Sequence, residues 1–279
     1  MKGLVIKKNA DLFSVQSESG VVKVKSRKNM KNDGIFVGDS VEFDEVIEKI
    51  EPRKNLLIRP PLANVDKMFI TIAPIPKPDF LLVDKMIVYC QMSKIKPYLL
   101  INKTDLVSDD FASKVKKLYK NVLPVLTTCA REEETKSLEK EISGICAFAG
   151  QSAVGKSSLI NALKLEKSAI VGDLSKKIAR GKQTTRTVQL YKTKNGYIAD
   201  TAGFSMLSLP LISKIKEAEL DGYYPDFLPY KKNCKFRSCL HQKEKECGII
   251  EAVKEGYISQ ERYQNYLKIL AEISASRRY

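Results

Sequence analysis

The segment GQSAVGKSSL, residues 150–159, decides the expected fold because it satisfies the phosphate-loop pattern G-x-x-x-x-G-K-[ST]. The apolar run ICAFA precedes the loop and LINAL follows the GKSS of the motif, so the pattern stands where a buried strand passes into a helix. Glycines in such a turn let backbone N–H groups face phosphate oxygens, and the helix N-terminus adds partial positive charge. The segment therefore predicts a nucleotide-binding domain.

The side chains of this loop have separate expected roles. Lys156 is expected to reach the β- and γ-phosphate oxygens, and Ser157 to ligate Mg²⁺. The residues expected to contact the nucleotide are Gly150, Gln151, Ser152, Ala153, Val154, Gly155, Lys156, Ser157 and Ser158.

A base-recognition motif, NKTD at residues 102–105, comes before the phosphate loop in the chain. The Asp105 carboxylate can accept hydrogen bonds from N1–H and the 2-amino group of guanine, which adenine does not offer. The Lys103 stem would cover the ring, Asn102 would brace the loop, and Thr104 is counted among the nucleotide contacts. Alone, the motif is a weak signal and is better explained as a helix cap formed by Thr104 or Asp105. Beside a phosphate loop it predicts selectivity for GTP and GDP.

Two further segments predict a site that senses the γ-phosphate. In IADTAGF, Asp200 ends an apolar strand and can hold the Mg²⁺ shell through water, while the Gly203 N–H can meet the γ-phosphate. In the preceding ARGKQTTRTVQL, either Thr184 or Thr185 could close on Mg²⁺ as a switch. An exposed basic loop is the alternative interpretation of that segment.

The chain order of these motifs is circularly permuted, because the base reader precedes the phosphate loop and the sensor. Strand-like and helix-like runs alternate from about 61 to 210, which predicts an α/β domain with a doubly wound, mostly parallel sheet. All loops at the carboxyl edge of such a sheet face one ligand, whichever strand comes first. Residues 1–60 alternate apolar and polar residues between turns, which predicts a small antiparallel barrel. Residues 211–279 form a third section with a helix-like SQERYQNYLKILAEI.

The third section contains a metal-ligand pattern, C-x₄-C-x-H-x₅-C. Three thiolates and one imidazole at this spacing predict one structural zinc ion that stabilises a small module. A disulfide is disfavoured because three cysteines cannot pair evenly and the expected compartment is reducing. The other three cysteines are expected to be buried packing residues. The predicted ligands are Cys234, Cys239, His241 and Cys247.

Composition limits the class of partner. The 279-residue chain has 48 Lys and Arg against 33 Asp and Glu, for a net charge of +15, which favours a polyanionic partner. The alternative is that the charge only reflects a host whose proteins are generally rich in lysine, and then it indicates no partner. Neither an N-terminal apolar run nor a long uncharged stretch is present, so we expect no membrane association and a cytoplasmic location.

Taken together, the motifs resemble one family. The order of barrel, NKxD, GxxxxGKS, GxxTTR, DTAGF and C-x₄-C-x-H-x₅-C is similar to that of the circularly permuted GTPases of small-ribosomal-subunit biogenesis, the RsgA or YjeQ family. Further matches are VGDSV, IEPRKNLLIRPPLANVD, ERYQNYLKIL and Glu244 in the zinc loop.

The resemblance implies an oligonucleotide-binding-type (OB) barrel at 1–60, a GTPase domain at 61–210 and a zinc domain at 211–279. It implies a monomeric GTPase that assists late maturation of the 30S subunit, binds 16S rRNA through barrel and zinc domain, and is stimulated by the particle. Mg²⁺ would accompany GTP. Two rival hypotheses are a signalling or membrane-associated G protein and a nucleic-acid-binding zinc protein with a vestigial nucleotide site. Salt-sensitive binding to small subunits with stimulated GTP turnover would separate all three.

One position departs from the family pattern. The switch usually reads GRHTTR, whereas here it reads GKQTTR, so Gln183 stands in place of the histidine. The residue after DTAG is Phe204, which cannot orient water as the Ras glutamine does. Gln183 is our candidate for that role, and a solvated loop residue is the alternative. The predicted catalytic residues are Gln183, Thr184, Thr185, Asp200 and Gly203.

Overall fold

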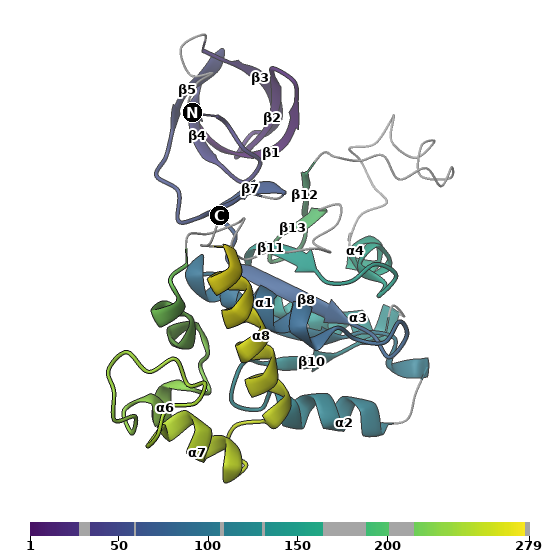
Figure 1. Ribbon diagram of the computed structural model, residues 1–279. Helices are drawn as coiled ribbons and strands as arrows, with labels where there is room; N and C mark the ends of the chain where they lie inside the picture. Colours follow the sequence, from purple (N-terminus) through teal and green to yellow (C-terminus); the bar gives the residue numbers. More distant parts are fainter. Residues whose placement is uncertain are drawn as a thin grey trace. The chain divides into compact units, whose positions relative to one another are not determined.

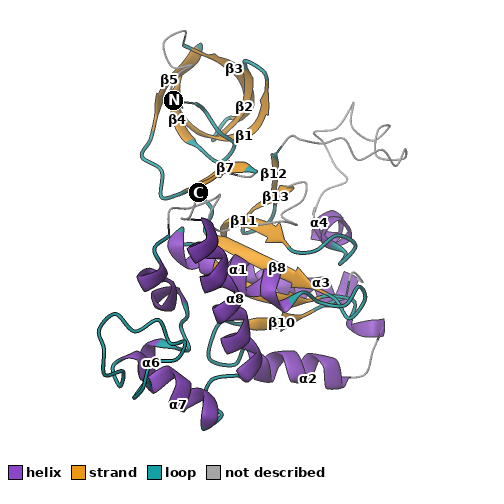
Figure 2. Cartoon of the chain, in the orientation of Figure 1, coloured by secondary structure: helices purple, strands orange, loops and turns teal. Residues whose placement is uncertain are grey.

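The computed structural model describes residues 1–27, 34–58, 60–106, 109–129, 132–163, 188–200 and 215–276 (Figures 1 and 2). The chain divides into two compact units. Unit 1 comprises Met1–Met68, Cys129–Phe148 and Gly155–Phe204. Unit 2 comprises Phe69–Thr128, Ala149–Val154 and Ser205–Tyr279. The three-domain division at 60 and 210 remains a prediction.

A closed barrel of five described strands begins unit 1. The strands are β1 (Lys2–Asn9), β2 (Leu12–Ser17), β3 (Gly20–Ser26), β4 (Ser40–Phe43) and β5 (Val46–Ile50). Strand β1 pairs with both β2 and β4, which closes the order β1-β2-β3-β5-β4. The pairs are antiparallel as expected, except that β3 and β5 run parallel. Alternate residues fill the interior because successive side chains of a strand point to opposite faces; they include Val5, Phe13, Val15, Val24, Val41, Phe43 and Ile47.

A partly buried ion pair holds the chain that leaves the barrel. Arg53 donates from Nε to Asp39 Oδ1 at 2.6 Å and from Nη2 to Asp39 Oδ2 at 2.8 Å, and Asp39 is fully buried. The same Nη2 also donates to the carbonyl oxygen of Gly34. The segments VGDSV and IEPRKN, which supported the family resemblance, therefore meet through one bidentate contact. The short hairpin β6 (Leu56–Ile58) and β7 (Pro61–Ala63) follows.

The rest of unit 1 holds three more sheet strands. Strand β11 (Gly144–Ala149) runs parallel to β13 (Gly196–Asp200), which pairs antiparallel with β12 (Gln189–Lys192). Strand β12 also pairs with β1 at Lys7 and Gln189. Helices α3 (Glu132–Glu141) and α4 (Lys156–Leu163) contact each other, and α4 contacts β13.

Unit 2 contains the parallel strands β9 (Lys96–Ile101) and β10 (Val125–Thr127), in the order β10-β9-β8 with β8 (Lys67–Ile72). Strands β8 and β9 are buried almost throughout, as parallel strands covered on both faces must be. The helical elements are α1 (Phe80–Met92), η2 (Thr104–Leu106) and α2 (Asp109–Leu118). The alternation of strand and helix agrees with the predicted α/β class.

The C-terminal section belongs to unit 2 and packs on helix α1. Its described elements are η3 (Glu217–Tyr223), α6 (Leu228–Lys231), α7 (Gly248–Lys254) and α8 (Gln260–Ser276). Their apolar core joins Val88 of α1 to Tyr224, Phe227, Ile249 and Tyr266. Helix α8 confirms the helix expected at SQERYQNYLKILAEI.

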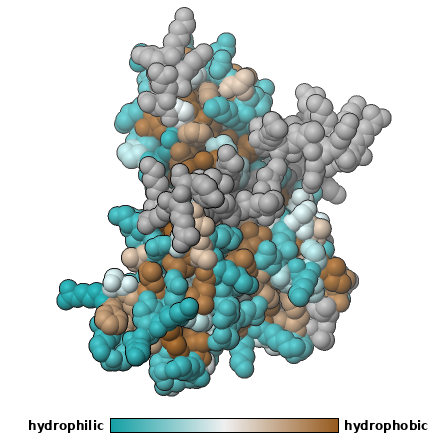
Figure 3. Space-filling model, viewed as in Figure 1, coloured by the Kyte–Doolittle hydropathy of each residue, from teal (hydrophilic) through white to brown (hydrophobic). Residues whose placement is uncertain are grey.

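Two composition-based expectations can be compared with the structure. Cys90, Cys129 and Cys146 are buried and form no disulfide, as predicted for packing residues. None of the described helices has the length and apolar character that a membrane span requires. Figure 3 shows a largely hydrophilic visible face with scattered hydrophobic residues.

Candidate nucleotide site and metal centre

The phosphate loop has a backbone that only certain residues can adopt. Gly150 has a φ of 134°, and a Cβ at this position would lie 2.1 Å from the Thr71 carbonyl oxygen. A side chain there would therefore collide with the end of β8, which explains the first glycine of the motif. Gly155 also has a positive φ, 93°, directly before α4. Helix α4 begins at Lys156, as the motif predicts.

The cation of the loop lies in a partly desolvated position. Burial lowers the pKa of Lys156 from its ordinary value. A phosphate group nearby would oppose that effect, because a negative charge favours the protonated amine. Ser157 and Ser158 are exposed in the first turn of α4. Exposed serines in the first turn of a helix suit a phosphate and Mg²⁺ site.

The base-recognition motif is fastened to the phosphate loop within unit 2. Asn102 is buried at the end of β9 and donates from Nδ2 to the Val154 carbonyl oxygen at 2.8 Å. Lys103 donates from Nζ to the Ala153 carbonyl oxygen at 2.7 Å and to that of Ile75 at 3.2 Å. The structure thus brings together two motifs that lie far apart in the sequence.

One atom of this motif lacks a partner. Asn102 Oδ1 is buried and accepts no hydrogen bond from the described residues. An acceptor left in this state costs about 1–3 kcal/mol. A donor from a bound ligand or water would remove that cost.

The carboxylate that would read guanine is accessible. Asp105 lies in the turn η2 and is exposed, and the neighbouring Thr104 donates from Oγ1 to the Thr128 carbonyl oxygen at 3.4 Å. Thr128 follows strand β10, and its N–H donates to the Ile101 carbonyl oxygen at 2.8 Å. Thr128 belongs to none of the motifs in the sequence. Its position after the apolar run VLPVL could have placed it at the same edge of the predicted sheet as NKTD.

The sensor and switch are described only in part. Asp200 is the last residue of β13, is half-buried and pairs with Gln189 of β12. Its place at the end of a buried strand is the one predicted. The other predicted catalytic residues lie outside the described residues, and they are Gln183, Thr184, Thr185 and Gly203.

The four predicted metal ligands form one cluster. Their ligand atoms all lie within 4.8 Å of one another. His241 Nδ1 lies 3.3 Å from Cys247 Sγ and 3.6 Å from Cys234 Sγ, and the Sγ atoms of Cys239 and Cys247 are 3.6 Å apart. A tetrahedron built with Zn–S bonds of about 2.3 Å has edges of about 3.8 Å. Three thiols and one imidazole at these separations fit a closed tetrahedral site, and no ligand is missing.

Contacts outside the ligand set orient the histidine. His241 Nε2 lies 3.1 Å from Asp221 Oδ2, which leaves Nδ1 to face the thiols. Lys231 Nζ donates to Asp221 Oδ1 at 2.9 Å. Although burial opposes the change, the hydrogen bonds from His241 and Lys231 lower the pKa of Asp221. Asp221 was missed by the sequence analysis, because it lies well before the ligand pattern and in no motif.

A second carboxylate holds the turn between the ligands. Glu244 accepts hydrogen bonds from the backbone N–H groups of Leu240 at 2.8 Å, Gln242 at 2.7 Å and Lys243 at 3.0 Å. Although partial burial opposes the change, these donors lower the pKa of Glu244. The turn places His241 at a φ of 58°, an uncommon conformation for a residue with a Cβ.

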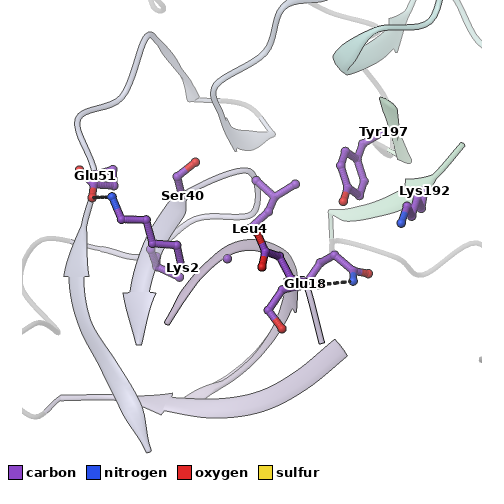
Figure 4. Close-up of a pocket in the computed structure, with 11 residues that line it drawn as sticks. Lys2, Leu4, Glu18, Ser40, Glu51, Lys192 and Tyr197 are labelled. Atoms are coloured by element: carbon purple, nitrogen blue, oxygen red, sulfur yellow. Dashed lines mark hydrogen bonds and ion pairs between the residues drawn. The ribbon is translucent and has the colours of Figure 1, made fainter. Parts of the chain in front are cut away.

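A groove of about 420 Å³ lies in unit 1, between the barrel and the β12–β13 hairpin (Figure 4). Its charges are mixed, because Lys2 and Lys192 lie beside Glu18 and Glu51, and Lys2 Nζ is 3.4 Å from a Glu51 carboxylate oxygen. None of its lining residues belongs to the phosphate loop, the base-recognition motif or the metal cluster. We therefore assign neither nucleotide binding nor metal binding to this groove.

Comparison with known proteins gives consistent matches. A family model described as RsgA GTPase matches residues 50–210. A small ribosomal subunit biogenesis GTPase RsgA from Caldanaerobacter subterraneus subsp. tengcongensis is 39% identical, over 100% of this chain and 98% of the relative. One from Carboxydothermus hydrogenoformans is 40% identical, over 100% and 99%.

Solved structures match over the same extent. YjeQ from Thermotoga maritima aligns with a TM-score of 0.81 and 34% identity, over 98% of both chains. YloQ, a circularly permuted GTPase, aligns with a TM-score of 0.80 and 31% identity, over 98% of this chain and 95% of that one.

Proposed function

This chain belongs to the RsgA family of circularly permuted GTPases, and on that premise we propose that it hydrolyses GTP while assisting late maturation of the 30S ribosomal subunit. The family resemblance inferred from the motifs is confirmed. The fold class is confirmed as well, since the barrel, the α/β sheet and the Cys₃His cluster all accompany the family match.

The observation that carries the nucleotide proposal is the direct bonding of the base-recognition motif to the phosphate loop. The contacts from Asn102 to Val154 and from Lys103 to Ala153 set the two loops at a fixed separation. A ligand that offers phosphates to one loop and a guanine edge to Asp105 would use both. GTP and GDP have this chemistry, whereas ATP lacks the two donors that Asp105 requires.

Hydrolysis requires a metal ion and an ordered water. Mg²⁺ would neutralise charge on the β- and γ-phosphates, with Ser157 and Asp200 among the residues that hold it, together with Thr184 or Thr185. Gly203 would meet the γ-phosphate through its N–H. We assign orientation of the attacking water to Gln183, since an amide can donate to one group and accept from another.

We assign one zinc ion to the Cys₃His cluster. A closed set of four protein ligands is typical of structural rather than catalytic zinc, because no position remains for water or substrate. Within residues 234–247 only Cys239 and Cys247 belong to the buried apolar core, so the metal would provide much of the stability of this loop.

The proposed partner is the small subunit with its 16S rRNA. The net charge of +15 suits a polyanion, and KVKSRK at 23–28 and YKKNCKFR at 230–237 place cations beside the barrel and the metal cluster. We expect a monomer that works in the cytoplasm, where ribosomal subunits mature.

The deciding experiment measures GTP turnover with and without purified 30S particles, and binding to them over a range of salt concentrations. We expect slow intrinsic turnover, stimulation by the particle, and affinity that falls steeply as salt rises. Neutralising both basic patches should weaken binding and reduce its salt dependence. Turnover that ignores the particle would favour a signalling G protein, and salt-sensitive binding without turnover would favour a vestigial nucleotide site.

A further inference from the structure

Helix α1 is held at its N-terminus by a side chain of the phosphate loop, within unit 2. The backbone N–H of Asp79, the N-cap residue, donates to Gln151 Oε1 at 2.9 Å. Gln151 Nε2 in turn donates to the Lys77 carbonyl oxygen at 3.3 Å. The Asp79 carboxylate caps the helix by accepting from the Leu82 N–H at 3.0 Å. A movement of the phosphate loop would therefore act on the first turn of α1.

The middle of α1 is tied to α8 by a buried charge network. Arg262 of α8 donates through Nη1 to Asp84 of α1, and through Nε and Nη2 to Asp226 at 2.9 and 2.8 Å. Asn265 Nδ2 donates to Asp84 Oδ2 at 2.8 Å. Arg262 and Asp84 are each 1% exposed. Buried charges at this depth are tolerated only while they remain paired, so α1 and α8 cannot separate at low cost.

The same turn of α8 contacts the metal-binding loop, residues 239–247. Tyr263 donates from its hydroxyl to the His241 carbonyl oxygen at 2.7 Å. Tyr266 donates to the Leu240 carbonyl oxygen at 3.1 Å. These carbonyls belong to the turn that gives His241 its positive φ. The position of the histidine ligand thus depends on α8, and the position of α8 depends on α1.

We propose that Arg262, Tyr263 and Tyr266 are positioning residues that couple the nucleotide state of the phosphate loop to the metal-binding loop, residues 239–247. Each step is a polar contact within one compact unit, and no step relies on exposed charges that salt would screen. The inference rests on the proposed nucleotide site. By thermodynamic linkage, a nucleotide that stabilises α1 must also stabilise the loop to which α8 is bound.

Hydrogen exchange of backbone amides tests the coupling in the full-length, zinc-loaded protein. Saturating GDP with Mg²⁺ should slow exchange of the amides of residues 239–247 by about fivefold or more. Two variants should lose this GDP-dependent difference. R262K keeps a cation but lacks the planar fork that binds both carboxylates, and Y263F/Y266F removes only the two hydroxyl donors.

Y257F is the matched control, because it removes a tyrosine hydroxyl from the same module without touching the loop carbonyls. Tyr257 is 61% exposed and stacks on Tyr230, so the variant should retain the GDP effect. The difference between GDP-bound and free protein is the relevant quantity, since a purely structural defect would raise exchange equally in both states. Should R262K fail to fold, Y263F/Y266F carries the test.

The possible outcomes separate this inference from the nucleotide proposal. Binding of GDP with slower exchange in wild type and Y257F, but not in the two coupling variants, supports it. Binding of GDP without slower exchange in the wild type overturns the coupling and leaves the nucleotide site standing. Failure of GDP to bind at all overturns the nucleotide site and this inference with it.

Discussion

The metal centre and the nucleotide site are assembled from the sequence in opposite ways. All four metal ligands come from one short stretch, 234–247, so little chain has to be ordered to bring them together. The nucleotide site draws on NKTD at 102–105, on the phosphate loop and on Asp200, which the sheet must align. The metal centre therefore depends on its ligands for its fold, whereas the nucleotide motifs rest on strands that fold without them.

The largest expected effect is loss of the metal. Cys239→Ser, or removal of zinc by a strong chelator, should unfold the metal-binding loop and α7, while α8 stays packed on α1 and GDP binding persists. Structural zinc contributes on the order of 10 kcal/mol to such modules. Metal content together with hydrogen exchange of α7 and the zinc loop measures this effect. A protein that lacks zinc yet keeps the module folded would contradict the comparison.

Loss of the guanine-reading carboxylate should be smaller and should leave the fold intact. Asp105→Asn removes a charged acceptor for two donors, at about 1.5 kcal/mol or more each. The preference for GTP over ATP should therefore fall by about 100-fold. Competition binding with GDP and ADP measures the change, and thermal unfolding serves as the control. Wild-type protein that binds ATP as well as GTP would refute the assignment.

A residue outside the ligand set tests how far the metal centre extends. Asp221→Asn keeps the shape but removes the charge that faces His241 and Lys231. Loss of such a contact to a metal-bound histidine typically lowers metal affinity about 10- to 100-fold. Zinc affinity measured by competition with a chelator should fall in that range, with GDP affinity unchanged. Unaltered zinc affinity would confine the centre to its four ligands.

The smallest predicted effect concerns water orientation. Gln183→Ala should lower 30S-stimulated turnover roughly 10-fold at unchanged GTP affinity, a loss of about 1.4 kcal/mol in transition-state stabilisation. Single-turnover rates with and without the particle make the measurement. If turnover equals that of the wild type, another group orders the water and Gln183 is a solvated loop residue.

Much of the molecule could be predicted because its motifs are local. The phosphate loop needs a glycine where Gly150 meets β8, and the ligand pattern needs its cysteines within one loop. The alternation of barrel residues and the helix at 260–276 follow from periodicity of side chains. Even the permutation could be read, because motif order is a property of the chain alone.

The contacts that unite these motifs could not be predicted in the same way. Asp221 supports His241, and Arg262 pairs with Asp84, across separations for which the sequence has no periodic or motif signal. Thr128 was likewise missed, since a threonine after a short strand is ordinary until β10 is seen beside β9.

The sequence by itself determined the family, the fold class, the likeness of NKTD and GQSAVGKSS to a guanine-nucleotide site, and the four metal ligands. Only the tertiary structure decided that Asn102 and Lys103 bind the phosphate loop, and that α1 and α8 join this loop to the metal cluster. The physical reason is that local motifs are imposed by backbone geometry and coordination chemistry. Buried polar partners are instead determined by the three-dimensional environment, because an unpaired buried charge or donor would lower the stability of the fold too far.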